Sequence, residues 1–304
     1  MKKFLSKLFV FTLPILSYFV LLECIVKTIP NSYSYKYNYV INNGKEINAV
    51  AIGHSQLYDG FCPDSFFMKS FNLCNSAQSY QDDYYILKEL LPYMPNLQLV
   101  IIPIGYMNVS TKTNSDVVFN DRSIFYYEYM NVNYDGKLPL KYKYEICSPQ
   151  RAISKVISYY LKKEDIIGCD SMGMRSTHHL KNRVNELGFG HLDLHYAKNI
   201  HSNFHLSGED YLLKIIEFVH KNNVKIILVS PPYYWKCFST INYAQKEYIE
   251  KYTNNLCAKY SIKYLNMEND TSFVNDDFFD ETHLSELGAE KFTKKLNDSL
   301  EFGF

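Results

Sequence analysis

Two unbroken apolar runs constrain the fold more than any other feature of the chain. Residues 99–102 read Leu-Val-Ile-Ile and residues 226–229 read Ile-Ile-Leu-Val. A strand with one face in water alternates apolar and polar residues, whereas a strand covered on both faces is apolar throughout. Both runs therefore indicate the centre of a parallel sheet with helices on its two faces. This pattern predicts a doubly wound, flavodoxin-like three-layer α/β fold.

Strand and helix patterns alternate along the rest of the chain. Strands are expected at residues 47–53, 68–73, 97–104, 224–230 and 262–267, and helices at residues 81–93, 149–163, 208–222, 243–260 and 285–300. Three of these helices begin with capping signals: Pro149 after Ser148, Ser207 before two acids, and Ser285. In this fold class, ligands bind beyond the carboxyl ends of the strands.

The N-terminus carries a segment that is long enough to cross a membrane. Residues 8–26 are almost wholly apolar, and a spanning helix needs about 20 such residues. A cleaved signal peptide is the competing interpretation, but the run is long for one and no small-x-small site follows it. We expect an uncleaved anchor (residues 1–29), a linker (30–46) and one domain (47–304) with a variable insertion at about 110–206.

Charge distribution predicts both the orientation and the excluded partners. Lys2, Lys3 and Lys7 precede the apolar segment, which predicts a cytoplasmic N-terminus and a periplasmic C-terminal domain at the bacterial inner membrane. Over the whole chain 32 basic residues balance 32 acidic ones, so no charge-driven binding of nucleic acid is expected.

The cysteines do not follow a metal-binding pattern. None of the seven forms a Cys-x-x-Cys pair or a zinc-like spacing. In an oxidising compartment, Cys62 and Cys74 would close the shortest plausible disulfide loop. The alternative is that the cysteines are small buried apolar residues without bonds.

Two stretches at opposite ends of the chain carry residues for nucleophilic chemistry. Gly53-His54-Ser55 follows the first expected strand, which is where a tight turn would present a nucleophile. Most Gly-x-Ser turns are only turns or helix caps. Near the C-terminus, Asp280 precedes His283 by three residues, just before the final helix. A carboxylate and an imidazole at this spacing can meet within one turn. The earlier acids at 276 and 277 are expected to lie in a solvated turn.

Together these stretches resemble the SGNH, or GDSL-like, hydrolase superfamily. The arrangement is most similar to its membrane-anchored branch, which serves bacterial surface-polysaccharide and teichoic-acid acylation. The resemblance covers roughly residues 47–300 and is specific only at its two ends. It implies that Ser55 is the nucleophile, that His283 is the general base and that Asp280 orients the imidazole.

The same resemblance implies an oxyanion site on the loops after the second and third strands. Asn75 and Ser76 would offer backbone N–H groups, and Asn108 would offer its side-chain amide. The alternative for each asparagine is an ordinary loop-capping role. The second loop lacks the family's glycine, and the third is one residue longer than the family's pattern. His54 and Gln56 flank the nucleophile as secondary candidates, and bracing of the loop is the expected role of His54.

The middle of the chain is rich in histidine and arginine. His191, Asp193 and His195 would share a face in a strand, and His201 and His205 would share one in a helix, which allows a metal site. A variable insertion that shapes the acceptor groove is the favoured interpretation, so we expect no metal and no cofactor. This region also contains four arginines, for which contacts with anionic sugars and ion pairs with surface acids are the two alternatives. They are Arg122, Arg151, Arg175 and Arg183.

The expected function is transfer or hydrolysis of acyl groups through an acyl-serine intermediate. The substrates would be an acylated donor and a surface glycan, with O-acetyl as the leading acyl group and a polytopic membrane-bound O-acyltransferase as a possible partner. The membrane segment and the 28 tyrosines and 20 phenylalanines, which suit sugar rings, favour a glycan acceptor. An esterase differs only in its acceptor. The rival class is a non-catalytic scaffold or glycan-binding partner that keeps the fold.

Overall fold

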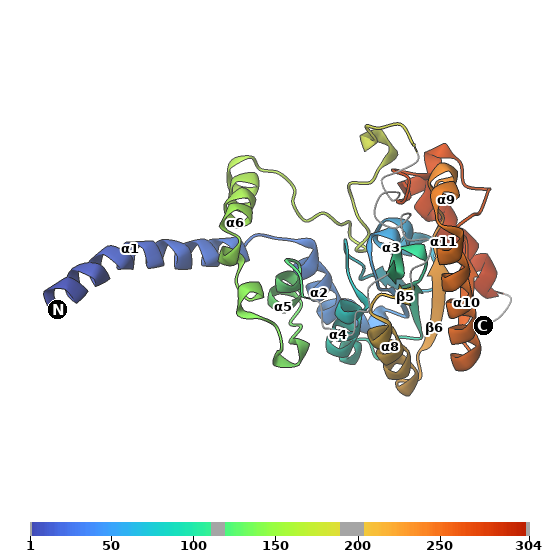
Figure 1. The fold of residues 1–304 in the computed structure, drawn as a ribbon, viewed down its shortest axis with the longest axis horizontal. Helices are drawn as coiled ribbons and strands as arrows, with labels where there is room; N and C mark the ends of the chain where they lie inside the picture. Colours follow the sequence, from blue (N-terminus) through green and yellow to red (C-terminus); the bar gives the residue numbers. More distant parts are fainter. Residues whose placement is uncertain (1, 111–118, 189–203, 302–304) are drawn as a thin grey trace. The chain divides into compact units, whose positions relative to one another are not determined.

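The computed structural model describes residues 2–110, 119–188 and 204–301. The chain forms two compact units (Figure 1). The anchor unit comprises Met1–Tyr37 and Val118–Gly168, and the sheet unit comprises Asn38–Val117 and Cys169–Phe304. Residues 30–46, expected as a linker, instead contain helix α2 (Ser32–Asn43), whose sequence supplies residues to both units.

The sheet unit is organised around five parallel strands. They are β1 (Ala49–Ala51), β2 (Ser70–Asn72), β3 (Leu99–Pro103), β6 (Lys225–Ser230) and β7 (Lys263–Asn266). Their order is β2-β1-β3-β6-β7, with every neighbouring pair parallel. This is the flavodoxin-like order, in which the chain reverses its direction across the sheet between β1 and β3. The predicted fold class is confirmed.

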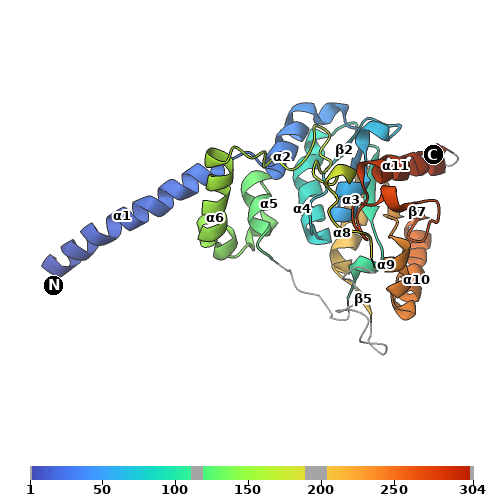
Figure 2. The same cartoon turned by 90° about the horizontal axis from the view of Figure 1, so that it is seen from above.

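Helices cover both faces of this sheet (Figure 2). They are α3 (Ser55–Gly60), α4 (Tyr80–Leu90), α8 (Glu209–Lys221), α9 (Trp235–Thr240), α10 (Tyr243–Tyr260) and α11 (Glu286–Glu301). Crossovers between parallel strands are right-handed. The connection from β1 to β2, which contains α3, runs across the sheet in the opposite direction to the connections that contain α4 and α8. Helix α3 therefore lies on the opposite face of the sheet from α4 and α8. The contacts agree, because α3 packs with α11 whereas α4 packs with α8.

The two apolar runs lie at the centre of the sheet. Every residue of β3 is buried, and so are Ile226 to Ser230 of β6. Full burial of a leucine or isoleucine side chain contributes about 1.5–3 kcal/mol. The two runs are apolar throughout because helices exclude water from both faces of the sheet, as the sequence pattern predicts.

Local capping explains where several helices begin. Ser79 and Asp82 form a capping box at α4, and the Asn242 side chain accepts the Ala244 N–H at α10. The Ser285 hydroxyl accepts the Gly288 N–H, as expected of an N-cap.

One expected cap is wrong, and one expected helix is shorter. The residue before α8 is Gly208, with φ of +72°, rather than Ser207. The Ser207 N–H instead donates to the Asn108 carbonyl at 2.7 Å, which extends a strand pair. The helix expected at 149–163 is α6 (Pro149–Val156) followed by a π turn, η8 (Ile157–Leu161).

The segment expected as an insertion begins and ends on paired strands. β4 (Val109–Ser110) runs antiparallel to β5 (His205–Leu206). Between them lie α5 (Ser123–Tyr129), α6 and several short turns. The single 3₁₀ turns of the chain's described residues are η1 (Gly44–Glu46), η2 (Pro63–Ser65), η3 (Leu91–Tyr93), η4 (Tyr106–Asn108), η5 (Tyr134–Gly136), η6 (Leu140–Tyr142), η7 (Glu145–Cys147), η9 (Leu180–Asn182) and η10 (Asn275–Asp277).

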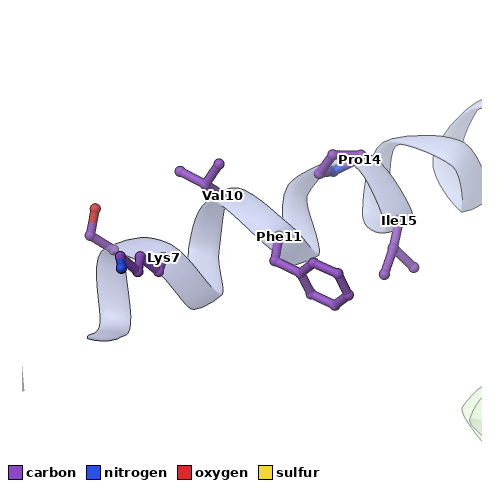
Figure 3. Close-up of a pocket in the computed structure, with 6 residues that line it drawn as sticks. Lys7, Val10, Phe11, Pro14 and Ile15 are labelled. Atoms are coloured by element: carbon purple, nitrogen blue, oxygen red, sulfur yellow. The ribbon is translucent and has the colours of Figure 1, made fainter. Parts of the chain in front are cut away.

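Helix α1 (Lys2–Lys27) dominates the anchor unit. Within the described residues it is the one helix long and apolar enough to cross a membrane, and its most apolar stretch has a mean hydropathy of 2.2. Val10, Phe11 and Ile15 project from it around Pro14 and line an open hollow made by α1 alone (Figure 3). No disulfide joins any of the seven cysteines, all of which lie within the described residues, so the disulfide expected between Cys62 and Cys74 is not formed.

Candidate active site

The turn after β1 places Ser55 at the first position of α3. Gly53 has φ of +124°, a backbone conformation that favours glycine, and a Cβ built there would lie 2.3 Å from the Pro103 side chain. The turn can therefore form only with glycine at this position. The first N–H groups of a helix have no intrahelical acceptor, so the Ser55 N–H is oriented to bind an oxygen in front of the helix.

A second tight loop, before α11, presents the acid and the imidazole. Asp280 Oδ1 accepts the backbone N–H groups of Thr282 and His283, each at 2.9 Å. The Phe279 N–H donates to the His283 carbonyl at 2.9 Å, which closes the loop. Three residues thus suffice to bring the Asp280 carboxylate against the His283 ring, as the spacing predicts.

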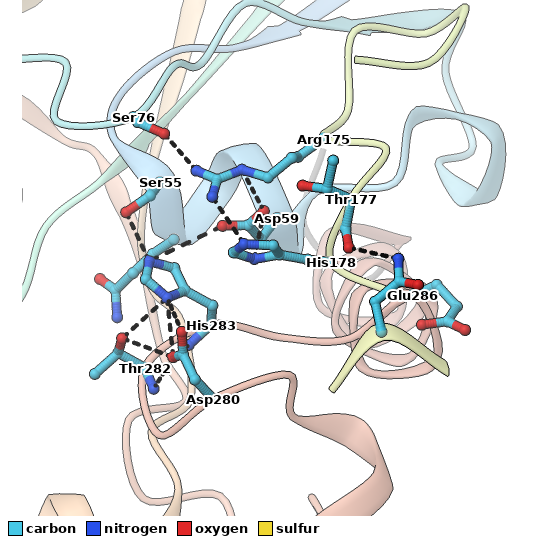
Figure 4. Close-up of polar contacts among 12 residues, drawn as sticks. Ser55, Asp59, Ser76, Arg175, Thr177, His178, Asp280, Thr282, His283 and Glu286 are labelled. Carbon is cyan, nitrogen blue, oxygen red and sulfur yellow. Dashed lines mark hydrogen bonds and ion pairs between the residues drawn. The ribbon is translucent and has the colours of Figure 1, made fainter. Parts of the chain in front are cut away.

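Ser55, His283 and Asp280 form one continuous relay (Figure 4). His283 Nε2 lies 2.8 Å from Ser55 Oγ, and His283 Nδ1 lies 2.8 Å from Asp280 Oδ2. Burial raises the pKa of Asp280, but its hydrogen bonds and charge interaction with His283, together with the bonds from Thr282, outweigh burial and hold that pKa well below its usual range. Asp280 is therefore ionised and accepts the Nδ1–H proton, which leaves Nε2 to accept from Ser55.

The alternative acids lie outside this relay. Asp276 faces Arg183, and the buried Asp277 pairs with Lys291 at 2.7 Å. Asp277 Oδ2 also accepts the Val274 N–H. Both acids therefore serve the turn before the loop, although Asp277 is buried rather than solvated.

His54 braces the nucleophile turn. Its Nδ1 atom accepts the Gln56 N–H at 3.4 Å, which makes it the N-cap of α3. Burial, with the nearby charge of His283, lowers the pKa of His54 to about 4, against a small opposing effect of Asn108. The ring is thus neutral near pH 7, and its capping nitrogen is committed to the backbone. The side chain of Gln56 is buried behind the turn, near Tyr233.

The loop after β2 departs from the expected oxyanion role at Asn75. Its backbone N–H donates to the Gly53 carbonyl at 3.1 Å, and its side-chain amide donates to Gln78 Oε1 at 2.8 Å. Asn75 therefore holds the nucleophile turn and has no backbone proton left for a substrate. Ser76 is half-buried, and its hydroxyl accepts a hydrogen bond from Arg175 Nη2 at 2.5 Å.

The loop after β3 brings Asn108 beside the nucleophile turn. Asn108 Oδ1 accepts the Gly105 N–H at 3.0 Å, and its side chain interacts with His54. Beneath this loop, the Tyr106 N–H donates to the buried Glu268 carboxylate at 3.1 Å. The extra residue of this loop is accommodated in the 3₁₀ turn η4, so the asparagine still reaches the edge of the sheet where Ser55 lies.

A buried acid and an arginine next to the relay were not predicted from the sequence. Asp59 lies four residues after Ser55 on α3 and is fully buried. Arg175 Nε lies 2.9 Å from Asp59 Oδ1, and Asp59 Oδ2 lies 3.9 Å from His283 Nε2 (Figure 4). His178 joins the same group, with its Nδ1 atom 3.1 Å from Asp59 Oδ1 and its ring stacked on Phe279. The i, i+4 spacing of Ser55 and Asp59 was the one signal in the sequence.

Arg175 links this acid to the loop after β2. Besides Asp59 and Ser76, its Nη1 atom lies 2.9 Å from His178 Nε2, and its guanidinium stacks over the Tyr58 ring. Arg175 thus pairs with a buried acid rather than with the surface acids or anionic sugars expected from the sequence. A planar guanidinium can make all these contacts at once, which an ammonium cannot.

One group of described residues has the spacing of metal ligands. Asp59, His178 and His283 bring their ligand atoms within 4.8 Å of one another. However, the Arg175 guanidinium already provides a positive charge 2.9 Å from the same carboxylate. A divalent ion would meet this charge at close range, so the residues fit a guanidinium better than a metal. His191, Asp193, His195 and His201 lie outside the described residues, and His205 pairs in β5.

A cavity of about 540 Å³ lies on the Asp280 side of the site. It is lined by residues 182–188 on one side and by Phe279, Asp280 and Glu281 on the other. Glu281 holds this lining in place, because its Oε1 atom accepts the Gly188 N–H at 2.9 Å. The cavity has both apolar and charged walls, which suits a ligand with polar and apolar faces.

Comparisons with known proteins give limited similarity. No family model matches the chain, and no curated protein matches it. Among solved structures, a lipase/acylhydrolase from Enterococcus faecalis is 10% identical with a TM-score of 0.40, covering 84% of this chain and 96% of its own. A GDSL-like lipase from Bacteroides thetaiotaomicron is 11% identical with a TM-score of 0.41, covering 90% and 100%. An aryl esterase from M. smegmatis, solved with an inhibitor, is 12% identical with a TM-score of 0.34, covering 85% and 100%.

Proposed function

We propose that this chain is a serine-dependent acyl transferase or esterase. The observation that carries the proposal is the unbroken relay from Ser55 Oγ through the His283 ring to the Asp280 carboxylate, with both connecting distances at 2.8 Å. A serine is a weak nucleophile until a base accepts its proton, and this geometry provides that base and its orienting acid.

In the first half-reaction, Ser55 Oγ attacks the carbonyl carbon of an ester while its proton passes to His283 Nε2. The Ser55 N–H donates to the resulting oxyanion. Collapse of this intermediate breaks the ester bond, and the leaving alcohol takes the proton from His283. In the second half-reaction, an acceptor hydroxyl gives its proton to His283 and attacks the carbonyl carbon of the acyl-serine. The bond from this carbon to Ser55 Oγ then breaks, Oγ takes the proton from His283, and the new ester is released. Water as the acceptor makes the same site an esterase.

We propose further that the donor and the acceptor are found outside the inner membrane. Helix α1 supports an anchored protein, and the lysines before it support a cytoplasmic N-terminus with the catalytic unit on the periplasmic side. An O-acyl group, O-acetyl in particular, on a surface glycan would be the substrate. The cavity beside Asp280 supports an acceptor of sugar size, and a polytopic membrane-bound O-acyltransferase is the proposed source of the acyl group.

The test is covalent labelling of the full-length protein in detergent by a fluorophosphonate probe, followed by intact mass measurement. We expect one probe to add to the wild type and none to add to Ser55→Ala or His283→Ala. Both variants should keep the wild-type circular dichroism spectrum, because Ser55 is at the first position of α3 and His283 lies in a loop, and neither side chain is part of the hydrophobic core. An unlabelled but folded wild type would make the non-catalytic scaffold the better proposal.

A second measurement separates transfer from hydrolysis. The acyl-enzyme formed with p-nitrophenyl acetate would be offered water alone or an oligosaccharide with free hydroxyls. Faster release with the oligosaccharide, together with an acetylated product, indicates a transferase. Equal release rates without a new ester indicate an esterase.

A further inference from the structure

An apolar stripe runs along the outer face of α6 and the π turn that follows it. Ile153, Ile157 and Leu161 are spaced by four residues and therefore lie on one side of the helix. Their exposed fractions are 39%, 39% and 76%. The adjacent face is packed, because Ala152 is fully buried and Val156 is partly buried against α1. An exposed row of large aliphatic side chains on a packed helix calls for a partner that removes it from water.

The packed face of α6 meets α1 where the apolar part of α1 ends. The side chains of α1 are largely exposed from Phe4 to Leu21, whereas Leu22 and Val26 are buried against Ala152. Eighteen helical residues span about 27 Å, which is close to the thickness of the hydrocarbon core of a bilayer.

Charged residues mark the same level of α1. Glu23 accepts the backbone N–H groups of Glu145 and Ile146 at 3.3 and 3.0 Å. Lys27 pairs with Glu128 at 2.9 Å. These groups need polar partners and cannot lie in hydrocarbon without them. If α1 crosses the bilayer, then the bilayer surface is at residues 22–27, and α6 lies at that surface.

The direction of α6 suits a helix that lies on a membrane. Within the anchor unit, α6 runs across the end of α1 rather than along it in both ribbon views (Figures 1 and 2). A helix that crosses the end of a spanning helix can lie along the bilayer surface, with its apolar side buried at the boundary of headgroups and acyl chains.

The segment before α6 has the composition of a membrane interface. Residues 137–144 contain three lysines, two tyrosines and no acid, and both Leu140 and Tyr144 are exposed. Tyrosines are enriched at the headgroup level, and lysines there are attracted by anionic lipids. The lysines of this segment would therefore be attracted to anionic lipid headgroups. An apolar groove of a partner protein would not account for these charges.

We propose that α6, η8 and residues 137–144 form a membrane-surface platform, seated in the outer leaflet of the membrane that α1 spans. The ligand is a lipid surface that contains anionic headgroups. This proposal rests on the anchoring of α1 proposed above, and it is independent of the acyl-transfer chemistry. With α1 alone, the anchor unit could rotate and tilt about one helix, and the platform would add a second attachment that restricts both motions.

The experiment places a single tryptophan at defined depths in the full-length protein. Trp235, the one native tryptophan, is first replaced by Trp235→Phe. Leu161→Trp then reports the platform, Phe11→Trp reports the anchor, and Val184→Trp, at a position 92% exposed in the sheet unit, reports water. Each protein is reconstituted into vesicles of phosphatidylethanolamine and phosphatidylglycerol that carry bromine at shallow or deep acyl positions.

We expect shallow bromine to quench Leu161→Trp at least twofold, deep bromine to quench Phe11→Trp most strongly, and neither to quench Val184→Trp. Quenching of Phe11→Trp without quenching of Leu161→Trp would overturn the platform and leave the anchor in place. Absence of quenching in both would overturn the anchor and the platform together.

Two further controls keep the outcomes separate. Ile157→Asp in the Leu161→Trp protein should halve the shallow quenching, whereas Lys163→Asp, on the exposed end of the same segment, should change it less. Labelling of Ser55 by the fluorophosphonate probe should be the same in the Phe11→Trp, Leu161→Trp, Ile157→Asp and Lys163→Asp proteins. These four positions belong to the anchor unit, whereas the relay and its cavity are built by the sheet unit. If the wild type resists labelling but Leu161→Trp is quenched, the platform holds and the proposed chemistry fails.

Discussion

Asp280 decides which nitrogen of His283 carries the proton. Asp280→Asn would place an amide N–H₂ group or a weaker acceptor against Nδ1 and would favour the tautomer with its proton on Nε2, which cannot accept from Ser55. We expect turnover of p-nitrophenyl acetate to fall about 10⁴-fold, as in other serine triads whose acid is neutralised. The melting temperature should change little, because the loop keeps the Oδ1 contacts of Thr282 and His283. An unchanged rate would remove Asp280 from the relay.

Arg175 is expected to position the site rather than to touch the reacting atoms. Arg175→Ala leaves the buried Asp59 carboxylate without its cationic partner, which typically costs about 3–5 kcal/mol. We therefore expect a marked loss of thermal stability and of labelling at Ser55.

A double variant separates the two effects of Arg175. Adding Asp59→Asn to Arg175→Ala removes the unpaired charge and should recover most of the lost stability. The rate of acylation should stay low, because Ser76 still lacks the guanidinium that holds its loop. Recovery of both stability and rate would show that Arg175 serves the fold alone. Arg175→Lys should recover only part of the rate, because an ammonium cannot reach Asp59, Ser76 and His178 together.

Two turns at the carboxyl end of the sheet give opposite predictions from one backbone argument. Gly53 and Ala77 both have positive φ, of +124° and +52°. Gly53→Ala would force a Cβ into Pro103, so we expect loss of labelling and a strong drop in melting temperature. Ala77→Gly should stabilise the fold by up to about 1 kcal/mol, because glycine adopts the left-handed backbone conformation of residue 77 without the steric strain that the alanine Cβ causes. Urea unfolding measures both, and destabilisation by Ala77→Gly would contradict the argument.

A buried acid at the end of β7 predicts a pH dependence of stability. Burial, against the Tyr106 N–H bond and Lys246, raises the pKa of Glu268 to about 7 from an ordinary value of 4.5. Between these two pH values the folded chain holds a proton that the unfolded chain has released. The free energy of unfolding therefore falls as the pH rises through this window, by about 3 kcal/mol in total.

Glu268→Gln should abolish that slope, because the amide keeps an acceptor for the Tyr106 N–H but does not titrate. His54, with its pKa lowered to about 4, contributes the opposite slope at pH 4–6.5 in both proteins, so the difference between wild type and variant isolates Glu268. The measurement is urea unfolding at half-unit steps from pH 4.5 to 8. Parallel curves for the two proteins would be evidence against a buried, protonated Glu268.

At the scale of the whole molecule, α1 is part of a folded unit as well as a membrane segment. Removal of residues 1–29 takes away Leu22 and Val26, whose burial contributes about 1.5–3 kcal/mol each, and leaves the Glu145 and Ile146 N–H groups without their Glu23 acceptor. We expect the remaining anchor unit, residues 119–168, to exchange its amide hydrogens rapidly. The sheet unit should keep its protection and its labelling at Ser55, because its strands and relay lie outside the deleted part. Equal protection of residues 119–168 in both proteins would refute this.

The sequence was sufficient for the features that depend on neighbouring residues. Continuous apolar runs reveal strands covered on both faces, and α10 spans the residues expected of it. The contacts among Ser55, His283 and Asp280 could be predicted because each half is local: a glycine and a serine two residues apart make the turn after β1, and an acid and a histidine three residues apart close one loop. The tertiary structure then only needs to bring these two locally determined turns together.

Only the tertiary structure decided the features that depend on distant residues. Nothing near Asp59 in the sequence indicates that Arg175, 116 positions later, will neutralise it. Nor does the sequence around Asn75 indicate that its backbone N–H donates to the Gly53 carbonyl. Because of this hydrogen bond, Asn75 stabilises the nucleophile turn and does not offer that N–H to an oxyanion. The packing of α1 on α6 joins residues more than 120 positions apart, so residues 30–37 of the expected linker and 118–168 of the expected insertion belong with α1 to one compact unit. Local patterns are determined by steric effects and hydrogen bonds between residues that are close in the sequence. The pairing of buried charges and of apolar faces depends on residues that are distant in the sequence, so it is determined only when the whole chain packs into one folded structure.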